Sequence, residues 1–337
     1  MLQRLCEQLE YYDILLQANE QDDPCLRMAY IIGFSLSQYA ATIGRVKKPF
    51  NPILGETFDF IPQDKSFRFV SEQVSHHPPI SAGYAESPEF EWWGDTSIKT
   101  NFWGNSFEAK ALNPVHIKLK KHQDHFTYRC PTISLQNIIF GSMYMEVFGE
   151  MPFTNLKTGE SGQLTFLKKG WNDKNMYKTE GWIKDNQGKL VIQLEGKWNS
   201  YIKATDLRTN EEHFIWQRKK LPENFPEQHS FSDFTKQLNH LHAELIQYIP
   251  ATDCRLRPDQ RAFEYGDIEL AKNEKFRLEE KQRARRKELK TKGEEHQPRW
   301  FIEVNDPISK ETNYEYRGEY FETRETGKFL DVLDLFT

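Results

Sequence analysis

The segment from residue 57 to residue 218 constrains the fold most strongly, because it repeats one pattern along its whole length. Short stretches rich in aromatic and β-branched residues alternate with Gly, Asn, Asp and Pro, as in FRFVSEQ, EFEWWGD, ISLQNIIFG, GQLTFLKK and KLVIQLEGKW. Roughly a dozen such runs in succession are typical of strands joined by turns, and they predict an antiparallel meander. About eight strands close into a barrel that its own side chains fill, whereas a wider barrel leaves a lumen. The sequence therefore predicts a mainly β fold with flanking helices (α+β), in which a large antiparallel barrel can enclose a cavity.

Helical patterns flank this segment on both sides. Residues 2–42 predict two helices, the second beginning at Asp22-Asp23-Pro24, where acidic side chains can cap backbone amides and proline suits the first turn. After a proline-broken linker at 222–228, an apolar stripe over residues 231–245 predicts another helix. The segment Ala271 to Lys292 then carries ten basic and four acidic residues, a local charge of +6. We expect one domain over residues 1–325, made of a helical segment 2–42, a barrel 48–218 and a C-terminal helical subdomain 229–325, with a tail at 326–337.

Composition excludes several classes of protein. The net charge of -5 argues against nucleic-acid binding, so any anionic ligand must be met by a local cluster of positive charge. No apolar run approaches the roughly 20 residues of a membrane-spanning helix. Four cysteines lie far apart in the sequence, which indicates reduced thiols and a cytoplasmic protein.

Two adjacent histidines, His76 and His77, stand out in the stretch SEQVSHHPPISA. In an extended backbone consecutive side chains point to opposite faces, so these two are not expected to share one metal ion. We find no nucleophile motif either, since GESG at residues 159–162 misses the G-x-S-x-G elbow by one residue. An enzyme with an unfamiliar motif remains an alternative.

Anion binding suits these histidines better. Imidazoles donate hydrogen bonds to phosphate, and a dianion raises the imidazole pKa towards the cationic form. Further donors are required, and Lys48 and Asn51 offer a charge and an amide. On the charged segment Lys275, Glu279 and Arg283 are spaced at i, i+4 and i+8 and so share one helix face. That spacing is equally typical of a solvated helix with internal ion pairs.

Several ordered motifs resemble the oxysterol-binding protein-related lipid transfer proteins. EQVSHHPP at Glu72 to Pro79 is similar to the fingerprint of that family, and KPFNPILGE, TDCRLRPDQR and ELAKNEKFRLEEKQR agree with it in the same order. The similarity extends over residues 2 to 325. It implies a lipid-binding domain in which an incomplete antiparallel barrel surrounds a tunnel.

The resemblance also implies a ligand and a set of binding residues. The tunnel of the family takes phosphatidylinositol 4-phosphate and, alternately, a second lipid, either sterol or phosphatidylserine. The implied roles are the 4-phosphate for His76, His77 and Arg283, the glycerol-linked phosphate for Lys48 and Asn51, the inositol hydroxyls for Lys275 and Glu279, and a weaker candidate role for Glu56.

The family resemblance sets the remaining expectations. We expect a lipid carrier rather than an enzyme, with no cofactor and no metal, acting as a monomer on membrane surfaces in the cytoplasm, including membrane contact sites. A sensor or scaffold that binds the phosphoinositide without moving it is the alternative. The family has a lid segment before the first helix, and the sequence beginning MLQRLCEQLE is expected to lack it.

Overall fold

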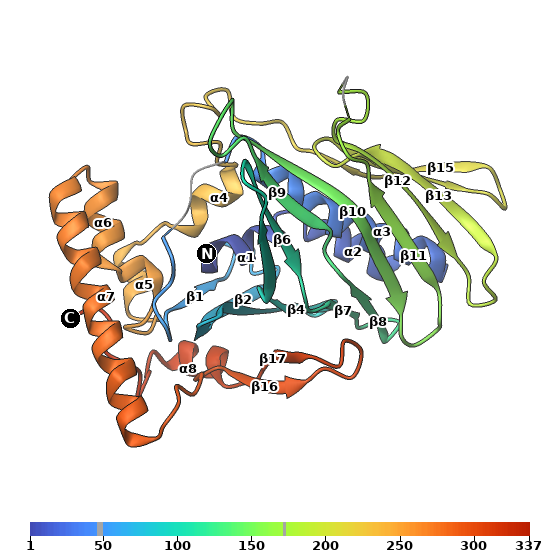
Figure 1. Ribbon diagram of the computed structural model, residues 1–337. Helices are drawn as coiled ribbons and strands as arrows, with labels where there is room; N and C mark the ends of the chain where they lie inside the picture. The colour runs from blue at the N-terminus through green and yellow to red at the C-terminus, as the bar shows by residue number, and fades with distance from the viewer. Residues whose placement is uncertain (46–49, 171–172) are drawn as a thin grey trace.

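The fold centres on one large antiparallel sheet, seen in a computed structural model that describes residues 1–45, 50–170 and 173–337 (Figure 1). In these residues fifteen strands belong to the sheet, and its main path runs β1-β2-β3-β4-β7-β8-β10-β11-β12-β13-β14-β15. The strands are β1 (Thr57–Phe60), β2 (Arg68–His76), β3 (Pro79–Glu86), β4 (Phe90–Asp95), β5 (Ile98–Phe102), β6 (Ser106–Ala111), β7 (Val115–Leu119), β8 (Asp124–Tyr128), β9 (Thr132–Gln136), β10 (Tyr144–Asn155), β11 (Ser161–Phe166), β12 (Lys178–Lys184), β13 (Leu190–Lys197), β14 (Tyr201–Asp206) and β15 (Glu211–Gln217). The predicted mainly β fold with flanking helices is confirmed.

The sheet curls without closing. Its path ends at β1 and β15, and no ladder joins these two strands in the part of the chain that the structure describes. The outer edge of β1 is covered instead by residues 252–253, since the Thr57 amide donates to the Thr252 carbonyl at 2.9 Å. This cover protects an edge that would otherwise present unpaired backbone groups.

A three-stranded branch leaves the main path. Strand β10 pairs with β8 through its last residues and with β9 through its first, and β9 in turn pairs with β6, which pairs with β5. The predicted strand ISLQNIIFG is wrong in its second half, because Asn137 has a positive φ and the chain leaves the ladder there. The apolar residues that follow form a loop.

Three helices lie within the curl of the sheet (Figure 1). They are α1 (Leu2–Cys6), α2 (Asp13–Glu20) and α3 (Pro24–Ser37), with single 3-10 turns at Glu7–Leu9 and Gln38–Thr42. As expected, α3 begins at a cap: the Asp23 carboxylate accepts the Leu26 amide at 2.8 Å, and Pro24 occupies the first turn. Helices α1 and α2 pack against β1–β4 and β7, and α3 packs against β12, β13 and β15, so one apolar core fills these parts of the curl.

The C-terminal third differs from the predicted helical subdomain in two respects. Its helices are α4 (Asp233–Leu238), α5 (Ala243–Ile246), α6 (Pro258–Glu264), α7 (Ile268–Lys292) and α8 (Tyr320–Thr326), with a 3-10 turn at Cys254–Leu256. The single helix expected over residues 231–245 is interrupted, because the chain leaves the helical conformation between α4 and α5. A hairpin of β16 (Phe301–Asn305) and β17 (Thr312–Tyr316) is also present, and it packs on the outer face of β3 and β4.

Buried Glu72 fixes this hairpin to the sheet. Its two carboxylate oxygens accept the backbone amides of Arg299 and Trp300 at 2.8 and 2.9 Å. Burial raises the pKa of Glu72 to about 7, although both hydrogen bonds act in the opposite direction. The carboxylate is therefore both a structural acceptor and a group that titrates near neutrality.

Helix α7 is a long and mostly solvated element. It begins at Asp267, whose side chain caps Leu270, and ends at Gly293 in the left-handed conformation. Only Ala271 and Leu278 are buried, and Leu278 packs with Ile53 and Leu335. Few apolar contacts therefore hold this helix, and polar contacts must supply the rest.

None of the helices in the described ranges combines the length and the apolar character that a bilayer crossing needs.

Glu72 makes stability depend on pH in a predictable direction. Because its folded pKa lies above the ordinary value of 4.5, the folded state holds the proton more tightly, and this stabilisation is present at low pH and lost as pH rises through 7. Glutamine cannot ionise, so we expect the free energy of unfolding of wild type, relative to that of Glu72→Gln, to fall by about 3 kcal/mol between pH 4.5 and pH 8, measured by urea unfolding. Glu150→Gln, an exposed change of the same charge, reports the general effect of removing one acid; a pH-independent gap for Glu72→Gln contradicts the prediction.

Candidate functional site

The two histidines lie where β2 ends and the turn to β3 begins. His76 is half-buried and His77 is exposed, and their ring centres are 4.4 Å apart. The expectation that they point to opposite faces is therefore wrong. Strand β2 ends at His76, so the alternation of an extended strand no longer governs His77. The two imidazoles can meet the same ligand.

Gln282 joins the histidines to α7 and to the segment of residues 50–56, here called the connector. Its side-chain nitrogen lies 3.2 Å from His76 Nε2, and its side-chain oxygen accepts the Leu54 amide at 2.8 Å. Gln282 was not predicted from the sequence, although it follows Glu279 by three positions and so lies near it on the helix. The β2–β3 turn, the connector and α7 thus surround one place, which we call the mouth.

The electrostatics of the mouth favour a neutral His76 in the absence of a ligand. Burial lowers the pKa of His76, and His77 and Arg286 lower it further, while Glu279 acts in the opposite direction. Arg286 is a second residue that sequence analysis missed, although it follows Glu279 by seven positions, close to two helical turns. The positive charge of Arg286 on α7 therefore acts on His76.

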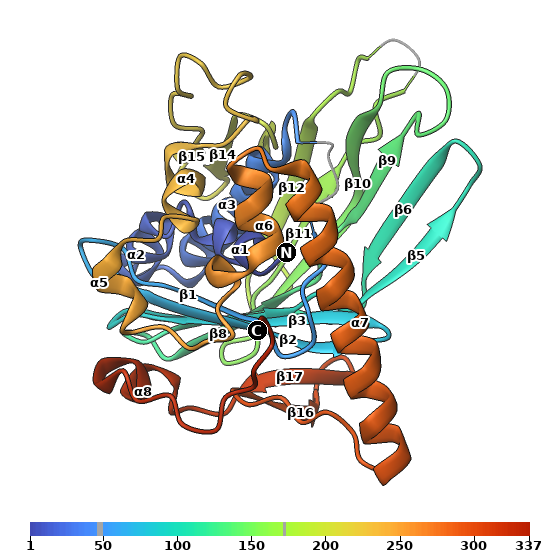
Figure 2. The same ribbon diagram turned by 90° about the vertical axis from the view of Figure 1, so that its left-hand side faces the viewer.

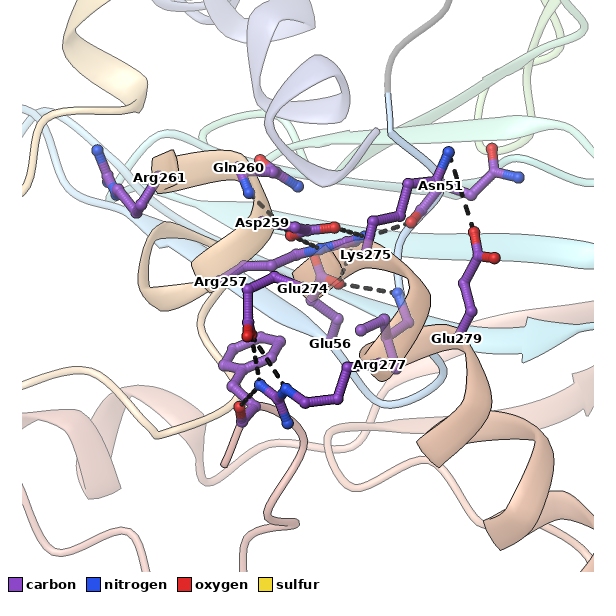
Figure 3. A network of polar contacts seen from close by, with 12 residues as sticks. Asn51, Glu56, Arg257, Asp259, Gln260, Arg261, Glu274, Lys275, Arg277 and Glu279 are labelled. Atoms are coloured by element: carbon purple, nitrogen blue, oxygen red, sulfur yellow. Dashed lines mark hydrogen bonds and ion pairs between the residues drawn. The ribbon is translucent and has the colours of Figure 1, made fainter. Parts of the chain in front are cut away.

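The predicted stripe on α7 is present, and its members pair with one another. Lys275 and Arg283 lie 4.0 and 3.7 Å from the Glu279 carboxylate, and Arg283 also contacts Glu280. All these side chains are substantially exposed, and in this conformation they form the internal ion pairs typical of a solvated helix. Figure 3 shows Lys275 and Glu279 joined, with the Asn51 side chain beside them.

The connector is held by a buried ion pair. Arg257 donates to the Glu56 carboxylate at 2.9 Å and to the Asn51 carbonyl at 2.8 Å, and it also binds Asp259 (Figure 3). Glu56 additionally accepts the Ile53 amide at 2.8 Å and is almost completely buried. Glu56, the weaker candidate, is therefore placed to position the connector, while the exposed Asn51 stands at the mouth. Lys48 lies outside the described residues.

An apolar surface begins beside the mouth. The Thr96 amide donates to the Ser81 carbonyl at 2.9 Å, so the β5–β6 hairpin starts next to the first residues of β3. The ladder registers place Ile98, Phe102, Phe107, Leu135 and Met145 on one face of the branch β5–β6–β9–β10. This is the inner face of the sheet, since Val147 and Met151 of β10 continue it into the core.

That inner face is incompletely covered. Ile98, Phe102 and Phe107 are 43%, 63% and 39% exposed, although they are large apolar side chains. A separate hollow of about 1380 Å³ lies between β1, β2 and the α4–α5 region, and none of the candidate residues lines it. The arrangement at the mouth thus combines polar donors with an adjoining open apolar surface, as a binding site for an amphipathic molecule requires.

Comparison with known proteins agrees with this arrangement. The family model described as oxysterol-binding protein matches residues 1–325. The chain belongs to the oxysterol-binding protein family. That is a family of binding proteins, and membership sets the enzyme alternative aside.

Individual relatives extend the comparison. The chain is 37% identical to oxysterol-binding protein homolog 2 of Saccharomyces cerevisiae, over 100% of the chain but 28% of that protein. The chain therefore spans less than a third of that relative's length. Among solved structures, the Osh1 ORD domain in complex with cholesterol superimposes with a TM-score of 0.91 at 35% identity, covering 100% of this chain and 84% of that one. The Osh3 ORD in complex with PI(4)P from Saccharomyces cerevisiae gives 0.86 at 30% identity, covering 99% and 87%.

Arg257 is buried and Arg283 is exposed, so their removal should affect the free energy of unfolding differently. Arg257→Ala leaves the Glu56 carboxylate buried without its partner, so we expect a loss of about 3–5 kcal/mol in the free energy of unfolding. Arg283→Ala removes an exposed partner and should cost about 0–1 kcal/mol. Urea unfolding of both variants checks this, and equal losses would show that Arg257 does not hold the connector.

Proposed function

We propose that this domain takes phosphatidylinositol 4-phosphate from a membrane, holding the phosphorylated headgroup at the mouth and the acyl tails on the apolar inner face. One arrangement supports the proposal: two adjacent imidazoles lie against α7, through the contact between His76 and Gln282, and an open apolar surface begins beside them. The complex of the related Osh3 domain with PI(4)P supports the choice of ligand.

The energetics explain why a carrier needs the apolar surface. Burying one methylene group is worth about 0.8 kcal/mol, so two acyl chains of about 16 methylenes each lose roughly 25 kcal/mol on leaving a bilayer. Spontaneous release of such a lipid is therefore very slow. An inner face that replaces most of this contact lowers the cost of carrying the lipid through water.

The headgroup donors provide selectivity. A phosphate dianion raises the pKa of His76, reversing the effect of burial, so binding is accompanied by proton uptake. Arg283 and Lys275 give up only exposed ion pairs when they turn to the ligand, and such pairs are worth about 0–1 kcal/mol each. The internal ion pairs of α7 therefore compete weakly with a phosphate, and the two interpretations of the stripe are compatible.

Exchange between membranes follows from the use of one site. We propose sterol as the second lipid, supported by the cholesterol complex of the Osh1 domain, with phosphatidylserine as the alternative. Because both ligands occupy the same inner face, one must leave before the other enters. The domain would act as a monomer on membrane surfaces in the cytoplasm, including membrane contact sites.

Donor-to-acceptor transfer between liposomes separates a carrier from a sensor, since saturable binding without net transfer is expected of a sensor.

Removal of the paired imidazoles should abolish capture of the phosphoinositide. We expect His76→Ala combined with His77→Ala to reduce extraction of phosphatidylinositol 4-phosphate from liposomes at least tenfold, because the principal phosphate donors are lost. Circular dichroism and thermal unfolding should remain close to wild type.

The chain offers a matched control for this double variant. His240 and His242 form another close histidine pair, with ring centres 5.8 Å apart, on the exposed segment between α4 and α5. His240→Ala with His242→Ala should extract the lipid as wild type does. Normal extraction by the folded His76/His77 variant would refute the anion-binding role of the mouth.

Arg286 provides a second test, because its charge acts on His76. We expect Arg286→Ala to weaken phosphoinositide extraction about tenfold, as does the loss of one charge-assisted contact to phosphate. Lys287→Ala removes the same charge one residue later, on another side of α7, and should have little effect. If both variants weaken extraction equally, the effect is one of net charge and Arg286 has no particular place at the headgroup.

A further inference from the structure

Five exposed apolar side chains gather at the far end of the sheet branch. Phe102 and Trp103 lie at the β5–β6 turn, and Ile139, Phe140 and Met143 lie in the β9–β10 loop; together we call them the apolar tip. Trp103, Ile139 and Phe140 are 66%, 59% and 76% exposed. Figure 2 shows both hairpins projecting from the body of the domain on the same side.

Asn105 builds the tip as one unit. Its side-chain oxygen accepts the amides of Ile139 and Phe140 at 2.9 and 3.0 Å, and its side-chain nitrogen donates to the Phe140 carbonyl at 3.2 Å. The indole N–H of Trp103 donates to Glu108 at 2.9 Å. Backbone groups of Ile139 and Phe140 are thus hydrogen-bonded within the protein, while the side chains of both residues are exposed.

The chemistry of the tip fits a lipid surface. Trp, with an apolar ring and an N–H at its edge, prefers the membrane interface, and Phe adds apolar area beside it. Phe102 of the tip pairs with Phe107, so the tip is continuous with the apolar inner face. Nearer the base of the hairpin Lys99 and Lys110 lie directly opposite each other, an arrangement that is unfavourable in water and favourable beside anionic headgroups.

We propose that the apolar tip inserts into the interface of an anionic membrane and gives a lipid an apolar path from the bilayer to the inner face. This inference rests on the proposed lipid carriage, because the path has a purpose only if a lipid moves along it. Insertion itself needs no phosphoinositide.

The test uses Trp103→Ser with Phe140→Ser, which leaves Phe102 of the inner face intact. With phosphatidylcholine vesicles containing a minority of phosphatidylserine and no phosphoinositide, we expect the variant to partition at least tenfold less than wild type in flotation. Leu207→Ser with Phe214→Ser, two exposed apolar residues of the β14–β15 hairpin, should partition as wild type. Quenching of the tryptophan fluorescence by brominated lipid gives an independent readout. The Trp103→Phe variant serves as the blank, because it lacks only the signal of Trp103 and introduces no polar group.

The outcomes separate this inference from the proposed function. Binding of water-soluble short-chain phosphatidylinositol 4-phosphate, measured without vesicles, should be the same in wild type and in the tip variant. Unchanged vesicle partition of the tip variant, or absent quenching, overturns the inference and leaves the proposed function standing. A wild-type dimer that the tip variant abolishes, with vesicle partition unchanged, would assign the tip to a second copy of the chain and also overturn it. Failure of wild type to bind the short-chain lipid would overturn the proposed function alone.

Discussion

The buried guanidinium of Arg257 is the contact on which the mouth depends. It joins the Glu56 carboxylate and the Asn51 carbonyl of the connector to Asp259 at the start of α6, and α6 leads through a short turn into α7. A buried charge is tolerated only when its partners are all in place, so this network permits little variation in the path of the connector. Gln282 then links that connector to His76. The position of His76, the proposed headgroup donor, thus depends on Arg257, a residue that is itself buried.

Basic residues near this network are of two kinds, those that are buried in ion pairs and those that are exposed on α7. Arg257 is buried and paired with Glu56 and Asp259. Arg255 is buried and paired with Asp253, so both charges are neutralised within the fold. Arg283 and Lys275 lie on an exposed face and share Glu279 at distances of 3.7 and 4.0 Å. Solvent weakens the latter contacts, and a phosphate of higher charge can replace them. Burial, rather than residue type, therefore decides which cations remain free to bind.

Much of the fold could be predicted from local patterns. Alternating apolar residues and turn residues gave the antiparallel sheet, and Asp23 with Pro24 gave the start of α3, because these signals act within a few residues. The apolar run after Gln136 was misread as strand, since only the long-range bonds of Asn105 show that it is a loop held against another hairpin. The β16–β17 hairpin was missed, although FIEVN and TNYEY are short runs of strand type.

The site was harder to predict than the fold. The histidines and the α7 stripe were located through motifs, but a solvated helix has no apolar periodicity to show which side faces a neighbour. Gln282 and Arg286 were missed for that reason, and the position of Arg257 against Glu56 depends on residues about 200 positions apart. Their binding roles stay predictions.

The attachment of the β5–β6–β9 branch has a consequence for how such domains can vary. The branch meets the rest of the sheet through the first residues of β10, and its β5–β6 hairpin contributes no residue to the apolar core around α1–α3 in the described part of the chain. Adding or removing residue pairs in the β5–β6 hairpin would therefore change the length of the apolar inner face without disturbing the packing of α1–α3. Chain-length preference for a hydrocarbon cargo could in this way evolve independently of the chemistry that recognises its polar end.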